Sequence, residues 1–131
     1  MPRSNLSAQI TCICGSVRFK ERILEVARYL ELERGRIVVM PNVYSKIDLI
    51  KLEKSELDLL VSVHDQKIKM ADEVYVVDEP DSDGRPYIGE STKREIQLAE
   101  EEGKVVEYLS EDTRFHDFQR SYQERMQSNV S

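Results

Sequence analysis

Residues 87–96 combine a predicted helix start with side chains that can bind an anion and attack an electrophile. An irregular polar loop ends there, Ser91 and Thr92 stand at the expected helix entry, and Glu95 follows one turn later. The first turn of a helix has unpaired N–H groups and a partial positive charge, which suit an anionic ligand. We therefore expect Ser91 to help hold a phosphate or a sugar, and Glu95 to perform covalent or acid–base chemistry beside it.

The same spacing also fits a purely structural role. Thr92-x-x-Glu95 is a capping box, in which the Glu carboxylate accepts a hydrogen bond from the backbone N–H at the helix start. On spacing alone this role is the commoner one. The two hypotheses differ in geometry, because a capping Glu95 folds back onto the backbone of Thr92, whereas a nucleophile leaves its carboxylate open to a crevice.

The length and charge of the chain limit what it can be. At 131 residues we expect one domain over 1–131 with a single core and flexible ends at 1–8 and 127–131. The net charge of −6 argues against binding to a nucleic acid polymer. No apolar run approaches the length of a membrane span, and residues 1–9 lack the apolar run of a signal peptide, so we expect no membrane association.

The two cysteines, Cys12 and Cys14, lie two residues apart on one predicted strand and are poorly placed for a disulfide. This pattern indicates a reducing, cytoplasmic compartment. Cys-x-Cys alone is a weak metal signal, so we expect both residues to be small buried apolar groups. Asp81 and Asp83 are expected to be ordinary turn residues, because no Glu follows at the offset that a calcium loop needs. We therefore expect no metal and no cofactor.

Apolar runs and helical periodicities alternate along the chain. Strands are predicted at 9–14, 36–40, 73–78 and 105–109, and the first two are expected to be buried. Helices are predicted from Ser16 to Gly35, from Ser55 to Asp72, over 91–102 and from Ser110 onward. Residues 42–54 fit a short helix or an ordered loop, and 79–90 form a polar loop of unusual length for a strand–helix connection.

This alternation predicts a single-domain, flavodoxin-like or Rossmann-like α/β fold, with a parallel sheet of four to five strands and helices on both faces. Right-handed crossovers favour the first strand lying between the second and the third. Ligands in such sheets bind beyond the C-terminal strand ends, where the winding reverses. We therefore expect one crevice that brings together Ser16, Arg18, Asp78, Ser91 and Glu95.

Three further polar residues each admit a structural and a functional interpretation. His64 lies on an apolar helix face, where a core histidine bonded to a backbone carbonyl is commoner than a catalytic one, although its helix borders the crevice. Asp72 either ends its helix or takes part in the chemistry. Asp78, at a strand tip, is a candidate for binding ribose hydroxyls.

Two parts of the chain resemble known enzymes. Residues 14–18, Cys-Gly-Ser-Val-Arg, are similar to the Gly-Ser-Ile-Arg loop of the nucleoside 5′-monophosphate N-glycosidases. Residues 71–74, Ala-Asp-Glu-Val, and the helix pattern Glu-Ile-x-x-Ala-x-x-x-Gly-Lys over 95–104 resemble the wider nucleoside 2-deoxyribosyltransferase family. Residues 65–109 also resemble small relatives of that family that carry a Tyr-Ile-Gly-x-Ser-Thr loop.

The resemblance implies hydrolysis or transfer at the N-glycosidic bond of a nucleoside or nucleoside 5′-monophosphate. In that family a carboxylate on a helix attacks the anomeric carbon and displaces the base, by the logic of retaining glycosidases. The match implies Glu95 as the nucleophile and Asp72 as a second acidic group. Together with the predicted crevice, it suggests these substrate- or phosphate-binding residues: Gly15, Ser16, Arg18, His64, Asp78, Tyr87, Gly89 and Ser91. The family's habit and the amphipathic C-terminal helix predict a homodimer.

The chain departs from the family at two positions. Gln97 stands where the family has Gly two places after its Glu, and Cys12 stands where the glycosidases have an aromatic hydroxyl. Tyr87, on the long loop, can replace that hydroxyl if it points inward. These departures leave two alternatives open: a non-catalytic nucleotide-binding or signalling module on the same fold, and a structural or interaction domain whose crevice is filled by side chains.

Overall fold

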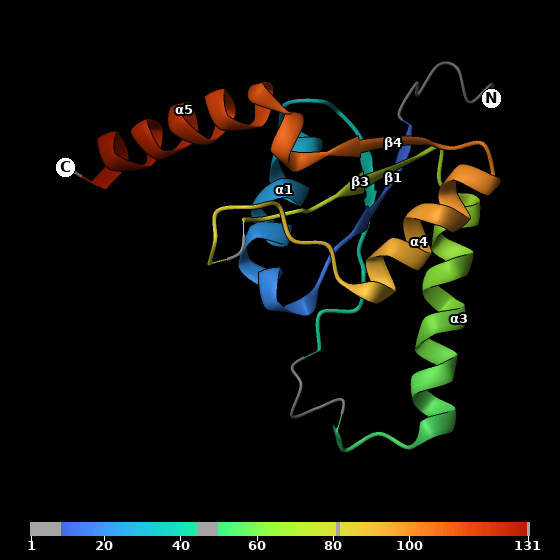
Figure 1. Ribbon diagram of the computed structural model, residues 1–131. Helices are drawn as coiled ribbons and strands as arrows, with labels where there is room; N and C mark the ends of the chain where they lie inside the picture. Colours follow the sequence, from blue (N-terminus) through green and yellow to red (C-terminus); the bar gives the residue numbers. More distant parts are fainter. Residues whose placement is uncertain (1–8, 45–49, 81, 131) are drawn as a thin grey trace.

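Four short apolar runs form a parallel sheet in the order β2-β1-β3-β4 (Figure 1). The strands are β1 (Ile10–Cys14), β2 (Ile37–Val39), β3 (Glu73–Val76) and β4 (Val105–Tyr108). β1 lies between β2 and β3, as the sequence predicts, and all three strand pairs are parallel. The computed structural model describes residues 9–44, 50–80 and 82–130, and within these ranges the predicted α/β fold is confirmed.

The central strands are buried and the edge strands are not. Every residue of β3 is buried, and so are Thr11 to Cys14 of β1. Ile37 in β2 is 49% exposed and Val105 in β4 is 62% exposed. The prediction of a buried strand at 36–40 is therefore wrong on burial, because an edge strand is paired on one side only and its outer part meets solvent.

Helices cover both faces of the sheet, as predicted (Figure 1). α1 (Lys20–Leu32) and α5 (Thr113–Val130) pack on one face, and α3 (Lys54–Met70) and α4 (Glu90–Glu101) pack on the other. Successive side chains of a strand point to opposite faces. Ile13 of β1 therefore joins the core under α1 and α5, whereas Cys12 and Cys14 join the core under α3 and α4.

Local sequence explains where α3 begins and where α4 ends. Glu53 and Glu56 form a capping box at the start of α3, each accepting a hydrogen bond from the backbone of the other. α4 ends in a Schellman motif, in which Gly103 has a φ of +71° and the Lys104 N–H donates to the Ala99 carbonyl. A side chain at Gly103 would be strained in this left-handed conformation.

The C-terminal helix α5 continues through Val130, and good helix formers such as Gln, Arg, Glu and Met fill its second half. The expected fraying from residue 127 stays a prediction. The expected flexible end at 1–8, the middle of the ambiguous stretch 42–54 and the Asp81 turn lie outside the described residues. Among the described helices, none has the length and apolar character needed to cross a membrane.

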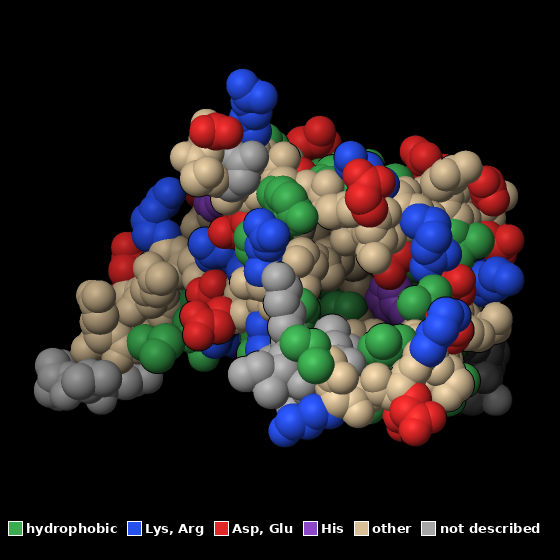
Figure 2. Space-filling view, turned by 60° about the horizontal axis from the view of Figure 1, so that its bottom comes forward, with side chains coloured by type: hydrophobic (Ala, Val, Ile, Leu, Met, Phe, Trp, Pro, Cys, Tyr) green, Lys and Arg blue, Asp and Glu red, His purple; other side chains and the backbone are tan. Residues whose placement is uncertain are grey.

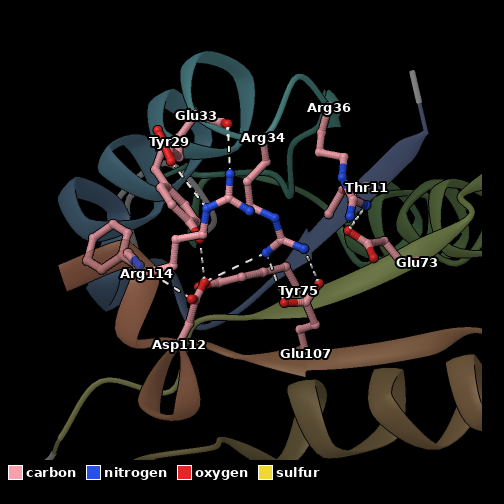
Figure 3. Close-up of polar contacts among 11 residues, drawn as sticks. Thr11, Tyr29, Glu33, Arg34, Arg36, Glu73, Tyr75, Glu107, Asp112 and Arg114 are labelled. Carbon is pink, nitrogen blue, oxygen red and sulfur yellow. Dashed lines mark hydrogen bonds and ion pairs between the residues drawn. The ribbon is translucent and has the colours of Figure 1, made fainter. Parts of the chain in front are cut away.

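A partly buried carboxylate, that of Asp112, joins α1, β3 and the start of α5 (Figure 3). Asp112 Oδ2 accepts hydrogen bonds from the hydroxyls of Tyr29 and Tyr75, at 2.9 and 2.7 Å. Its Oδ1 accepts a hydrogen bond from the Phe115 N–H at 3.3 Å, so the same side chain caps α5. The Arg34 guanidinium lies 3.7 Å from this carboxylate. Burial, together with the bond to Asp112, raises the pKa of Tyr29 to about 12, so this phenol stays protonated and remains a donor.

We expect Asp112→Ala to lower the free energy of unfolding by about 3 kcal/mol, because it removes a helix cap and leaves two buried hydroxyls without an acceptor. Urea denaturation followed by circular dichroism measures this change. Asp117→Ala is the matched control, because Asp117 lies on the same helix with its side chain 75% exposed. The control should change stability by less than about 0.5 kcal/mol. Equal effects of the two substitutions would contradict a stabilising role for this carboxylate.

Candidate functional site

A cavity of about 440 Å³ opens beyond the C-terminal ends of β1 and β2. Figure 2 views the molecule from this end and shows its surface hollowed near the centre. The wall consists of residues 15–17 after β1, residues 41–42 after β2, one side of α3 and parts of segment 87–95, which leads into α4. A crevice at this edge is what the strand order predicts for a parallel sheet.

Most of the predicted site residues meet at this cavity, namely Gly15, Ser16, His64, Tyr87, Gly89, Ser91 and Glu95. Ser16, Ser91 and Glu95 therefore line open space. This arrangement argues against a domain whose crevice is filled by its own side chains.

The loop after β1 is held in place by a close contact and a cap. A Cβ atom on Gly15 would lie 3.2 Å from Val77 Cβ and 3.3 Å from the Val77 carbonyl oxygen, so this approach suits glycine. Ser16 caps the 3-10 turn Val17–Phe19, and its hydroxyl accepts a hydrogen bond from the Arg18 N–H. The cap leaves the Ser16 side chain at the cavity wall.

Tyr87 points inward from the long loop. The Tyr87 N–H donates to the Glu79 carbonyl at 2.7 Å, which closes the loop at its base. The Arg18 guanidinium lies over the Tyr87 ring, 4.2 Å from the ring centroid, and Phe19 contacts the ring edge-on. Arg18 therefore stands beside the cavity, covering Tyr87, and is not part of the wall itself. Tyr87 thus lines the cavity from the long loop.

Glu95 does not cap its helix. The N-cap of α4 is Gly89, the cap makes no side-chain hydrogen bond, and Glu95 lies in the second turn. The capping-box hypothesis for Thr92 and Glu95 is therefore wrong. The Glu95 side chain lies in the cavity wall, 13% exposed, with Oε2 at 3.6 Å from His64 Nε2.

Burial dominates the electrostatics of Glu95 and His64. Burial raises the pKa of Glu95 to about 7; the Asp65 charge adds to this shift, and Arg94 and the Cys14 hydrogen bond oppose it. Burial, helped by nearby cations, lowers the pKa of His64 to about 4. His64 is therefore neutral at neutral pH, and its contact with Glu95 is not a pair of opposite charges. The sequence predicts a backbone carbonyl as the partner of a core His64. In the structure its Nε2 instead faces Cys14 Sγ, at 3.5 Å.

Two acidic residues of the predicted site lie elsewhere. Asp72 follows α3 at the N-terminal edge of the sheet, where its Oδ2 accepts a hydrogen bond from the Ile10 N–H at 2.7 Å. Asp78 is buried, and its two carboxylate oxygens accept hydrogen bonds from the N–H and the hydroxyl of Ser110. The structure therefore does not bring Asp72 or Asp78 to the cavity. Both carboxylates hold backbone segments together.

Three features of the site were not predicted. Arg94 lines the cavity and forms a bidentate pair with Asp65, at 2.8 and 3.2 Å. Asn42 joins the wall, and the rule that parallel strands end at one edge could have included the loop after β2. Behind His64, Cys12 and Cys14 approach its ring nitrogen, so that the three ligand atoms lie within 4.8 Å of one another. The Cys-x-Cys spacing places both thiols on one face of a strand, but only the packing of α3 adds the histidine.

A scan against models of known protein families found no match, and neither did a search of curated proteins. The function of the site is therefore inferred from its own residues.

We expect the stability of the protein to fall between about pH 4.5 and about pH 7 through Glu95. The pKa of this carboxyl rises from the ordinary 4.5 to about 7 on folding, so the folded protein holds the proton more tightly than the unfolded chain does. Its stabilising effect is complete below the ordinary value and is lost as pH rises through the folded value. The loss is at most about 3 kcal/mol, and Glu95→Gln, which cannot ionise, should escape it.

Urea denaturation of the wild type and Glu95→Gln at about pH 5 and about pH 8 measures this difference. EDTA keeps metal ions off the neighbouring thiols during the measurement. Glu101→Gln, an exposed position on the same helix, is the control and should follow the wild type. A constant stability difference between wild type and Glu95→Gln across this pH range would contradict the expectation.

Proposed function

We propose that this protein hydrolyses or transfers the N-glycosidic bond of a nucleoside or nucleoside 5′-monophosphate, with Glu95 as the nucleophile. One observation carries the proposal: the Glu95 carboxylate lies in the wall of an open cavity instead of capping its helix. A carboxylate in a partly dry pocket is the group that retaining glycosidases use to attack an anomeric carbon.

The size and donors of the cavity suit such a substrate. A volume of about 440 Å³ lies within the range of small-molecule sites. The N–H groups of residues 90–92 have no partner within the helix, as in any first turn. These three residues line the cavity, and Ser91 also carries a hydroxyl. Arg94 adds a guanidinium on the same wall. These donors support binding of a phosphate or of sugar hydroxyls at the α4 end of the cavity.

The reaction would take two displacements at the anomeric carbon. The Glu95 carboxylate forms a bond to this carbon, and the bond to the base nitrogen breaks with its electron pair going to the base, which takes up a proton. Tyr87 lines the same cavity, and we assign to its hydroxyl the hydrogen bond to the departing base. Water or a second base then attacks the same carbon, loses a proton and releases the Glu95 carboxylate.

A second candidate is a nucleotide-binding module without catalysis. It is favoured by the low exposure of Glu95, whose Oε2 faces His64. A nucleotide held by the first turn of α4 and by Ser16 would need no contact with this carboxylate. The two candidates share a ligand and differ in turnover.

Incubation with a panel of nucleosides and 5′-monophosphates, followed by chromatography of the free base, tests the proposal. We expect release of base from at least one compound, and Glu95→Gln should lower the rate at least about 100-fold because it removes the nucleophile. Glu101→Gln removes the same charge as Glu95→Gln, but at an exposed position outside the cavity. Its rate of base release should therefore match that of the wild type.

The outcomes separate the candidates. Base release that Glu95→Gln leaves unchanged would rule out Glu95 as the nucleophile. No release from any compound, combined with a rise in melting temperature on addition of a nucleotide, would instead support the binding module. Neither release nor a shift in melting temperature would contradict both.

A further inference from the structure

Two cysteines and a histidine meet beneath the cavity. Cys12 and Cys14 lie two residues apart on β1, so their side chains share one face of the sheet, and His64 comes from α3, which covers that face. The two sulfur atoms and a ring nitrogen of His64 all lie within 4.8 Å of one another. All three residues are buried.

We propose that Cys12, Cys14 and His64 bind one thiophilic divalent cation, with Zn²⁺ as the type that this donor set favours. Tetrahedral zinc, with bonds of about 2.3 Å to sulfur and about 2.0 Å to nitrogen, separates these two ligand atoms by about 3.5 Å. The distance between Cys14 Sγ and His64 Nε2 is 3.5 Å. This pair therefore lies at a separation compatible with a shared metal ion, and without a metal the same distance fits a hydrogen bond between the thiol and the imidazole.

The charge of the site also suits a metal ion. The surroundings are apolar, with Ile68 and Val74 among the neighbours, and an isolated charge there would be costly. Two thiolates neutralise one divalent cation, so the metal and its three ligands together carry no net charge, and any charge on the adjacent Glu95 comes in addition. This balance allows the metal to be buried without a further counter-ion.

One nitrogen of the His64 ring is placed to coordinate a metal ion. The other, Nδ1, has no hydrogen-bond partner among the described residues, so the ring is not oriented through that atom. Nε2 is directed toward the Cys14 thiol and Glu95. The nitrogen that is free to coordinate, Nε2, therefore faces the two thiols.

A fourth coordination position would face the cavity. His64 and Glu95 line the cavity, whereas the two cysteines lie deeper and contribute nothing to its wall. Catalytic zinc sites keep three protein ligands and leave the fourth position to water or substrate, often beside a carboxylate. A metal ion held by the three residues would thus be reached from the cavity, next to Glu95. This inference goes beyond N-glycosidic chemistry and does not depend on it.

Titration of the metal-free full chain with Co²⁺ under reducing conditions tests the proposal without any substrate. Cobalt bound by two thiolates gives an intense sulfur-to-metal charge-transfer absorption and the visible bands of tetrahedral coordination. We expect saturation at one equivalent per chain and loss of these bands when Zn²⁺ displaces Co²⁺. Zn²⁺ alone should raise the melting temperature, because a ligand that binds only the folded state stabilises it.

The two histidines of the chain provide a matched pair of variants. His64→Gln should weaken Co²⁺ binding at least about tenfold, whereas His116→Gln, at an exposed position on α5, should leave it unchanged. Cys12→Ala, a small apolar replacement in the core, should remove about half of the charge-transfer intensity. Circular dichroism of each metal-free variant confirms that it is folded before titration.

Three results would overturn the proposal. The first is the absence of charge-transfer bands in the wild type at excess Co²⁺. The second is binding that a folded His64→Gln variant retains at full strength, since metal held by thiols alone would not need the imidazole. The third is equal weakening by the His64 and His116 substitutions. None of these results depends on whether the protein cleaves nucleosides, so failure here and failure of the glycosidic activity remain distinguishable.

Discussion

The parallel pairing of β1 with β3 is the constraint on which the rest of the structure depends. Cys12 pairs with Val74 and Cys14 with Val76, so the two strands end at the same edge of the sheet. The chain leaves β1 through Gly15, whose close approach to Val77 leaves little room for a side chain. Since α3 leads into β3 and α4 follows it on the same face, this one pairing also brings residues of both helices to the cavity.

Burial outweighs direct attraction between charges at the centre of the site. Two opposite charges in contact would each favour the charged form of the other. The pKa of Glu95 instead rises and that of His64 falls, and in both cases burial is the leading cause. The apolar layer under α3 and α4 therefore disfavours the charged form of both groups: His64 is neutral at neutral pH, whereas Glu95 remains partly ionised there. Perturbed groups of this kind that line a cavity are concentrated at functional sites.

Three acidic residues away from the cavity hold backbone segments in place. Asp72 accepts a hydrogen bond from the backbone at the start of β1, and Asp78 accepts one from the backbone after β4. Asp112 caps α5 and also accepts hydrogen bonds from two buried tyrosine hydroxyls. Each of these carboxylates accepts a hydrogen bond from at least one backbone N–H. Glu95 differs because it lies in the second turn of its helix, where every backbone N–H already has a helical partner. Its carboxylate is therefore left for the cavity.

Local pattern determined the elements, their order and the edge at which a ligand would bind. Apolar runs, capping residues and glycines act over a few residues, so strands such as 9–14 and the predicted sheet order could be read from the chain. Only the tertiary structure decided how exposed the edge strands are, that Asp72 and Asp78 lie away from the cavity, and that the Glu95 side chain faces it. It also brought His64 to the two cysteines. These outcomes depend on which helix packs over which strand, and spacing along the chain does not determine which side chains of distant elements come into contact.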